Sequence, residues 1–166
     1  MCSKKWKQEV RRLKVKRTRF DIAIEIICLS LLIGIITYLL VKWNSLPDQV
    51  PGHYNGKGEV DRWGSKGELF ILPVVSWLLY LGITFVEAFP VIWNTGIKVT
   101  EENKEKVYRL IKSMIGLTKL IMIINFTFIE VNSIQGTSLP WFYLPVFLIL
   151  MFGVIILYIV RLVRIK

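Results

Sequence analysis

The chain has 166 residues, of which 54% are apolar, and its formal net charge is +10. A soluble domain with this composition could not cover its surface with polar side chains, so an ordinary soluble fold is excluded. The basic residues lie beside long apolar blocks, which favours contact with the anionic leaflet of a bilayer over contact with nucleic acid. Cys2 and Cys28 are the only cysteines, which excludes a cysteine-based zinc site.

The pattern predicts an all-α polytopic membrane protein with four transmembrane helices and a structured extracellular loop between helices 1 and 2. Residues 1–20 form a basic cytoplasmic arm, and residues 21–166 form the four-helix membrane domain. An apolar block of about 20 residues is long enough to cross roughly 30 Å of hydrocarbon. The helices are expected at about 22–42, 69–89, 101–131 and 141–161.

The third helix is expected to begin in the cytoplasm, before it enters the membrane. Thr100 can act as its N-cap, and Glu101 suits the positive end of the helix dipole. The connection after this helix is a short turn without charges.

Orientation follows from the distribution of Lys and Arg. Seventeen of the 22 basic residues lie in the arm, in the connection after the second helix and in the tail. By the positive-inside rule this places both termini in the cytoplasm of a multi-pass plasma-membrane protein.

The loop at 43–67 faces outward in this topology and reads as a compact lid. Pro47 and Pro51 favour an extended path, and Asn55-Gly56 and Lys57-Gly58 are turn signals. Functional residues often lie on such loops.

The loop also resembles a known signature, LPxxIPxH[FY]NxxGxxDxWxxK. That signature marks a bacterial membrane-domain family of unknown function, related to the immunity protein against the sporulation-delaying toxin. The immunity protein has further helices that this chain lacks. A looser similarity lies on the cytoplasmic side, at Asn94, Thr100, Glu101 and Asn103. The loop residues that carry the resemblance are Pro47, Pro51, His53, Asn55, Gly58, Asp61, Trp63 and Lys66.

His53 and Asp61 are open to three interpretations. They could act as a catalytic base and its orienting carboxylate, although no nucleophile is obvious. With Glu59 they could hold a metal ion, although a stable site normally needs three or four ligands. The structural interpretation is that His53 and Asn55 bond loop carbonyls, that Asp61 pairs with Arg62 or Lys66, and that Gly58 supplies a positive φ.

Three polar residues fall within the third membrane helix, where each needs a partner or an interface. Lys119 is close enough to the inner interface for its side chain to extend there. Asn125 is expected to form an interhelical hydrogen bond, and Glu130 to meet Lys42 or Lys66. A polar face packed into the bundle is favoured over a substrate path.

The resulting hypothesis is a non-enzymatic protein of the bacterial plasma membrane that serves immunity to, or sensing of, a toxin or antimicrobial peptide through its outer loop. Its expected partners are the lipid bilayer, a membrane-active peptide or toxin, a cytoplasmic regulator for signal transduction and a second copy of the chain, with no nucleic acid and no cofactor. One alternative is a membrane-embedded, metal-dependent enzyme acting on a lipid or peptide. Another is a small oligomeric transporter.

Overall fold

The structure is a computed structural model that describes residues 15–165, so the first 14 residues of the basic arm lie outside the described part. It contains four helices that are long and apolar enough to cross a membrane, which confirms the predicted fold class. The helices are α2 (Arg19–Lys42), α3 (Ile71–Ala88), α4 (Lys104–Gln135) and α5 (Tyr143–Val163).

Local sequence signals set several of the helix ends. Thr18 caps α2, because its hydroxyl accepts a hydrogen bond from the Asp21 amide while the Asp21 carboxylate accepts one from the Thr18 amide. α3 stops two residues before Pro90. α4 begins later than expected, at Lys104, and continues past residue 131 because no helix-breaking residue occurs before Gly136, whose φ is 69°.

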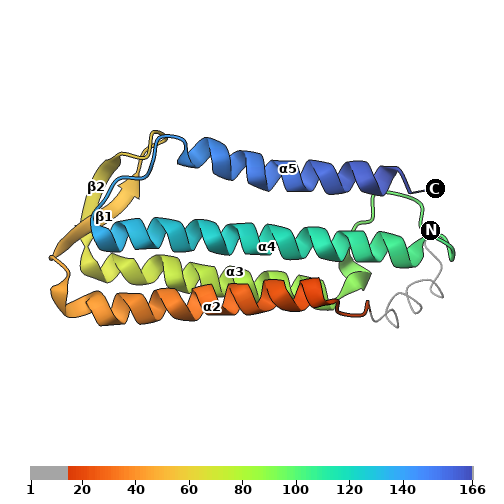
Figure 1. The fold of residues 1–166 in the computed structure, drawn as a ribbon, viewed down its shortest axis with the longest axis horizontal. Helices are drawn as coiled ribbons and strands as arrows, with labels where there is room; N and C mark the ends of the chain where they lie inside the picture. Colours follow the sequence, from red (N-terminus) through yellow and green to blue (C-terminus); the bar gives the residue numbers. More distant parts are fainter. Residues whose placement is uncertain (1–14, 166) are drawn as a thin grey trace.

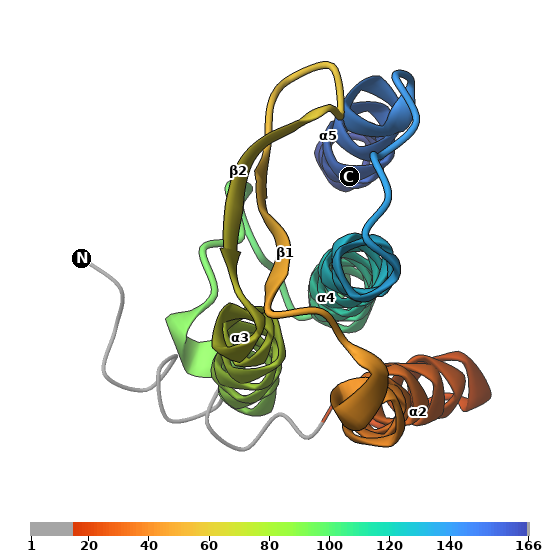
Figure 2. The same ribbon diagram turned by 90° about the vertical axis from the view of Figure 1, so that its left-hand side faces the viewer.

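The four helices run alternately up and down, and α4 lies at the centre (Figure 1). α2, α3 and α5 each pack mainly on α4. Seen from the end, α5 stands apart from α2 and α3 on the far side of α4 (Figure 2). The bundle therefore has a three-helix body and one peripheral helix.

In the chain, α2 is followed by a two-stranded antiparallel sheet and then by α3. The all-α prediction did not include this sheet. Its strands are β1 (Gln49–Tyr54) and β2 (Val60–Ser65), with an irregular register around His53. The turn signals at 55–58 sit between the strands, so the signal for a hairpin was present in the sequence. Short 3-10 helices flank the hairpin and follow α3: η1 (Trp43–Ser45), η2 (Lys66–Phe70) and η3 (Pro90–Ile92).

The hairpin is anchored to the bundle by an apolar cluster at one end of the helices. Val50 is 1% exposed and packs in this cluster with Leu39 of α2, Leu69 of η2 and Ile134 of α4. From this anchor the hairpin extends across the bundle from α3 toward α5 (Figure 2). We call this end the hairpin end and the opposite end, where α2 starts and α5 stops, the terminal end.

Candidate functional site

The tip of the hairpin is bonded to the connection between α4 and α5. The Leu139 amide donates to the Gly58 carbonyl at 2.8 Å. Gly58 has a φ of 85°, and a Cβ at this position would lie 2.5 Å from the Leu139 carbonyl oxygen. Glycine is required here both for the left-handed backbone and for this close approach.

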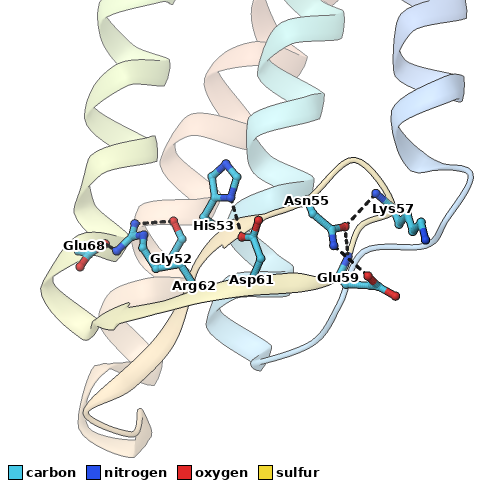
Figure 3. A network of polar contacts seen from close by, with 8 residues as sticks. All are labelled: Gly52, His53, Asn55, Lys57, Glu59, Asp61, Arg62 and Glu68. Carbon is cyan, nitrogen blue, oxygen red and sulfur yellow. Dashed lines mark hydrogen bonds and ion pairs between the residues drawn. The ribbon is translucent and has the colours of Figure 1, made fainter.

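Asn55 holds the turn from within. Its side-chain oxygen accepts hydrogen bonds from the amides of Lys57 and Glu59, and its amide group donates to the Glu59 carboxylate at 2.8 Å (Figure 3). Bonds of this kind are the usual reason for Asn in a turn.

At the base of the hairpin, Arg62 joins the two strands to η2. Its guanidinium donates to the Gly52 carbonyl at 2.8 Å and pairs with the Glu68 carboxylate at 2.9 Å (Figure 3). A Cβ at Gly52 would lie only 2.9 Å from this guanidinium, so the absence of a side chain allows the contact. Together these bonds make the hairpin a fixed element.

His53 and Asp61 face each other across the strands. The His53 Nδ1 lies 2.6 Å from the Asp61 carboxylate, and the two side chains are 64% and 42% exposed (Figure 3). The expectations that His53 bonds a loop carbonyl and that Asp61 pairs with Arg62 or Lys66 are therefore wrong, because the two side chains meet where the strand register is irregular, at His53 and its Cα partner Arg62. The pair is an imidazole oriented by a carboxylate, with the second ring nitrogen left available.

Tyr54, next along β1, reaches α4 and the connection that follows it. Its hydroxyl donates to the Thr137 carbonyl at 3.0 Å and lies 3.2 Å from the Ser133 hydroxyl. Burial raises the pKa of the Tyr54 phenol, the nearby Glu130 carboxylate raises it further, and the Ser133 hydrogen bond opposes both. The phenol therefore stays protonated and able to donate at neutral pH.

A pocket of about 550 Å³ lies beneath the hairpin. The hairpin forms its roof and α4 its back wall, while the first turns of α3 and α5 form its sides. The side walls are apolar, including Ile71, Leu72 and Leu144. We call this cavity the hairpin pocket.

Glu130 of α4 lines the hairpin pocket and is 2% exposed. Its Oε1 is buried and has no hydrogen-bond partner among the described residues. The expected pairing with Lys42 or Lys66 does not occur, since the Lys66 ammonium lies over the Trp43 ring, 5.3 Å from its centroid. A buried carboxylate without a partner is costly, which makes Glu130 the most unusual group of the site.

The other polar residues of α4 have partners on neighbouring helices. Lys119 is fully buried, 2.5 Å from the Glu25 carboxylate of α2 and 2.6 Å from the Glu87 carboxylate of α3, so it does not extend to the interface as expected. Asn125 accepts a hydrogen bond from the Tyr143 hydroxyl of α5. The sequence analysis did not predict that Glu25 and Glu87 pair with Lys119. A signal was present, because Glu25 lies near the start of α2 and Glu87 near the end of α3, and these two helix ends lie at the same end of an up-and-down bundle.

The second set of motif residues lies at the terminal end. The Thr100 amide donates to the Asn103 side chain at 2.8 Å, and the Asn103 amide donates to the Thr100 hydroxyl at 3.3 Å. Glu101 pairs with Lys104, and the Asn94 side chain accepts from the Gly96 amide at 3.1 Å. These bonds shape the turn before α4 and lie at the opposite end from the hairpin pocket.

The remaining loop residues divide between the core and the surface. Pro51 is buried in β1 beside Val50, whereas Trp63 is 53% exposed on β2. Pro47 lies in the segment between η1 and β1. No group of three His, Cys, Asp or Glu side chains within residues 15–165 is arranged to hold a metal ion, so Glu59 does not complete a site with His53 and Asp61.

These features define a class: a multi-pass membrane protein whose first two spans are joined by a rigid β-hairpin over a pocket. Residues 26–76 match the model of a domain of unknown function, DUF1648. The match covers most of α2, the whole hairpin and the start of α3, and it supports a membrane-domain family of unknown function.

One curated relative is an uncharacterized protein of Archaeoglobus fulgidus, 50% identical over 38 residues. The matched stretch is 23% of this chain and 21% of the relative, so it spans about a fifth of that protein's length. No solved structure matches the chain.

Proposed function

We propose that the chain is a non-enzymatic binding protein of the bacterial plasma membrane, which captures a membrane-active peptide or toxin beneath its hairpin and so provides immunity or sensing. The observation that carries this proposal is the hairpin pocket itself, a cavity of about 550 Å³ roofed by a fixed hairpin. This volume is within the usual range for ligand sites, and a rigid wall lowers the entropy cost of binding.

The charge distribution supports an outward-facing hairpin. Within residues 15–165, the basic residues at the hairpin end are Lys42, Lys57, Arg62 and Lys66, whereas 17 of the 22 basic residues of the sequence belong to the arm, the connection after α3 and the tail. By the positive-inside rule the pocket then opens at the outer leaflet, where an exported peptide arrives.

A route to the cytoplasm supports sensing. α4 runs without interruption from the hairpin pocket, at Glu130 and Ser133, to the turn at Thr100–Asn103. A change in the position of this helix would therefore alter the turn, where a cytoplasmic regulator could bind. Binding energy can shift such an element only if the ligand prefers one of its positions.

The enzymatic alternative depends on the His53–Asp61 pair. The pair orients an imidazole, which is one part of an acid–base site. A complete site needs a nucleophile or a metal ligand set as well. Within the described residues, the His53 imidazole has only the Asp61 carboxylate as a hydrogen-bond partner. The geometry therefore favours binding over catalysis.

The transporter alternative needs a continuous polar path along α4. Lys119 is enclosed by two carboxylates, and Asn125 is occupied by Tyr143, so these residues tie the bundle together. Glu130 lines the hairpin pocket, whereas Asn125 lines a separate pocket between α4 and α5. The polar side chains therefore do not line a common route.

Replacement of a pocket-wall residue tests the proposal. Leu144→Trp would fill the hairpin pocket, whereas Ile149→Trp adds the same ring to α5 at a site that is 70% exposed and away from the pocket. Each protein is reconstituted in dye-loaded phosphatidylcholine liposomes and challenged with an equimolar amphipathic peptide of leucine and lysine. Wild type and Ile149→Trp should slow dye release, and Leu144→Trp should not.

The release rate from protein-free liposomes is the reference. If wild type protects no better than empty liposomes, capture of membrane-active peptides is contradicted. If both tryptophan variants protect as well as wild type, the pocket is not the binding site.

A further inference from the structure

We propose that Glu130 is the receptor for a cationic group of the bound peptide, an ammonium or guanidinium group carried on an apolar body. This inference rests on the proposed function and specifies the chemistry of its ligand. It starts from the unpaired carboxylate at the back of the hairpin pocket.

The position of Glu130 suits a ligand entering from the hairpin end. It lies five residues before the end of α4, which is about 8 Å along a helix. At 2% exposure the carboxylate is withdrawn from solvent, yet its Oε1 has no partner among the described residues. A charge-assisted hydrogen bond from a ligand would satisfy this oxygen.

The acidic and basic side chains elsewhere around the pocket have partners of their own. Arg62 is paired with Glu68, and His53 with Asp61. Glu130 is left without a counter-ion among the described residues that line the pocket, and an entering cation would stabilise the ionised form of its carboxyl group. The pocket is therefore complementary to a single positive charge.

Aromatic rings strengthen this assignment. Tyr54 and Tyr143 both line the pocket, and their hydroxyls are held by hydrogen bonds to Thr137 and Asn125. A cation near the face of an aromatic ring is stabilised by about 0.5–2 kcal/mol, more when the site is desolvated. A carboxylate beside fixed tyrosine rings is thus suited to an ammonium group.

The apolar part of the ligand is indicated by the open flank of the pocket. α3 and α5 pack mainly on α4, and the hairpin bridges the space between them (Figure 2). Ile71 of α3 and Leu144 of α5, which both line the pocket, are 56% and 40% exposed. An amphiphile can therefore place its cation on Glu130 while its apolar body lies between the helices and the lipid.

The test compares two variants that each replace one carboxyl group by its amide. Glu130→Gln keeps the shape of the side chain, and Asp48→Asn neutralises an exposed carboxylate at the same end that does not line the pocket. Binding of the fluorescent leucine–lysine peptide to protein in phosphatidylcholine nanodiscs is measured against empty nanodiscs. A twin peptide with glutamine in place of lysine is measured in parallel, and circular dichroism checks the fold of each variant.

We expect Glu130→Gln to weaken binding of the lysine peptide about tenfold or more, as loss of one charge-assisted hydrogen bond requires, and Asp48→Asn to change it less than twofold. The glutamine peptide should bind wild type and Glu130→Gln equally weakly. Wild type that binds both peptides alike would overturn the role of Glu130 but leave peptide capture intact.

Two further outcomes would also overturn the inference. If wild type binds neither peptide, peptide capture fails and the assignment of Glu130 falls with it. If adding phosphatidylethanolamine to the nanodiscs abolishes peptide binding to wild type but not to Glu130→Gln, the carboxylate serves a lipid ammonium instead.

Discussion

Two charged residues of α4 show how partners determine the role of a polar side chain in a membrane. Lys119 has no exposed surface, and its ammonium contacts the carboxylates of Glu25 and Glu87 and the Thr84 hydroxyl. Its Nζ also lies 5.1 Å from the centroid of the Tyr80 ring. Every donor position of the ammonium is occupied, so this lysine joins α2, α3 and α4. Glu130, with its unpaired oxygen, is available to an outside partner.

Lys119→Met should destabilise the bundle strongly. The change keeps most of the length of the side chain but leaves two carboxylates close together without a cation. Breaking a buried ion pair by removing one partner typically costs about 3–5 kcal/mol. Thermal unfolding in detergent, followed by circular dichroism, would measure the loss.

The control for this prediction removes the charges together. Lys119→Met combined with Glu25→Gln and Glu87→Gln should recover most of the stability, because no uncompensated charge remains. An unchanged melting temperature in the single variant would contradict an ionic role for Lys119.

At the scale of elements, the hairpin acts as a fixed roof because it is bonded at both ends. Val50 anchors its base in the apolar cluster, and Gly58 joins its tip to Leu139. A hairpin of two strands is at best marginally stable alone, so these attachments are what hold it in place.

Gly58→Ala should release the tip of the hairpin. Alanine at a φ of 85° is strained, and its Cβ would collide with the Leu139 carbonyl. Strain of this kind costs about 1–3 kcal/mol. We expect faster amide hydrogen exchange at Leu139 and in residues 55–60, measured by mass spectrometry.

Gly56→Ala is the matched control, because Gly56 lies in the same turn without a positive φ and has open space around it. It should exchange at the wild-type rate. Equal protection in both variants would show that the contact with Leu139 does not hold the tip.

At the scale of the whole molecule, the bundle separates a bonded body from a peripheral helix. α2, α3 and α4 share the ion cluster around Lys119. In α5, by contrast, only 6% of the residues in an 18-residue apolar stretch are buried. The open flank between α3 and α5 is the result, and the hairpin pocket lies at its end. The orientation of the protein in the bilayer determines from which side of the membrane a ligand reaches the hairpin pocket.

Cysteine labelling would test the proposed orientation. The experiment uses a Cys2→Ser variant, so that Cys28 is the only native cysteine. Cys28 is buried and should stay unlabelled. A membrane-impermeant maleimide added to intact cells should label Lys57→Cys in the hairpin turn, whereas Lys98→Cys at the terminal end should react only after lysis. Labelling of Lys98→Cys in intact cells would contradict the proposed orientation and place the terminal end outside the cell.

The sequence by itself determined the four spans, since the length of an apolar block is a local property set by bilayer thickness. It also marked the turn at 55–58, because glycine and asparagine in a turn reflect local backbone needs. The hairpin strands were missed, since Gln49–Tyr54 and Val60–Ser65 lack a clear apolar alternation.

Only the tertiary structure decided the partners of the polar residues. The pairs of Lys119 with Glu25 and Glu87 join residues more than 30 positions apart, and the contact of Asp61 with His53 joins two strands at a register irregularity. The unpaired oxygen of Glu130 and the pocket in front of it depend on how α3, α5 and the hairpin are placed around α4. Such contacts follow from three-dimensional packing, which no local pattern of residues encodes.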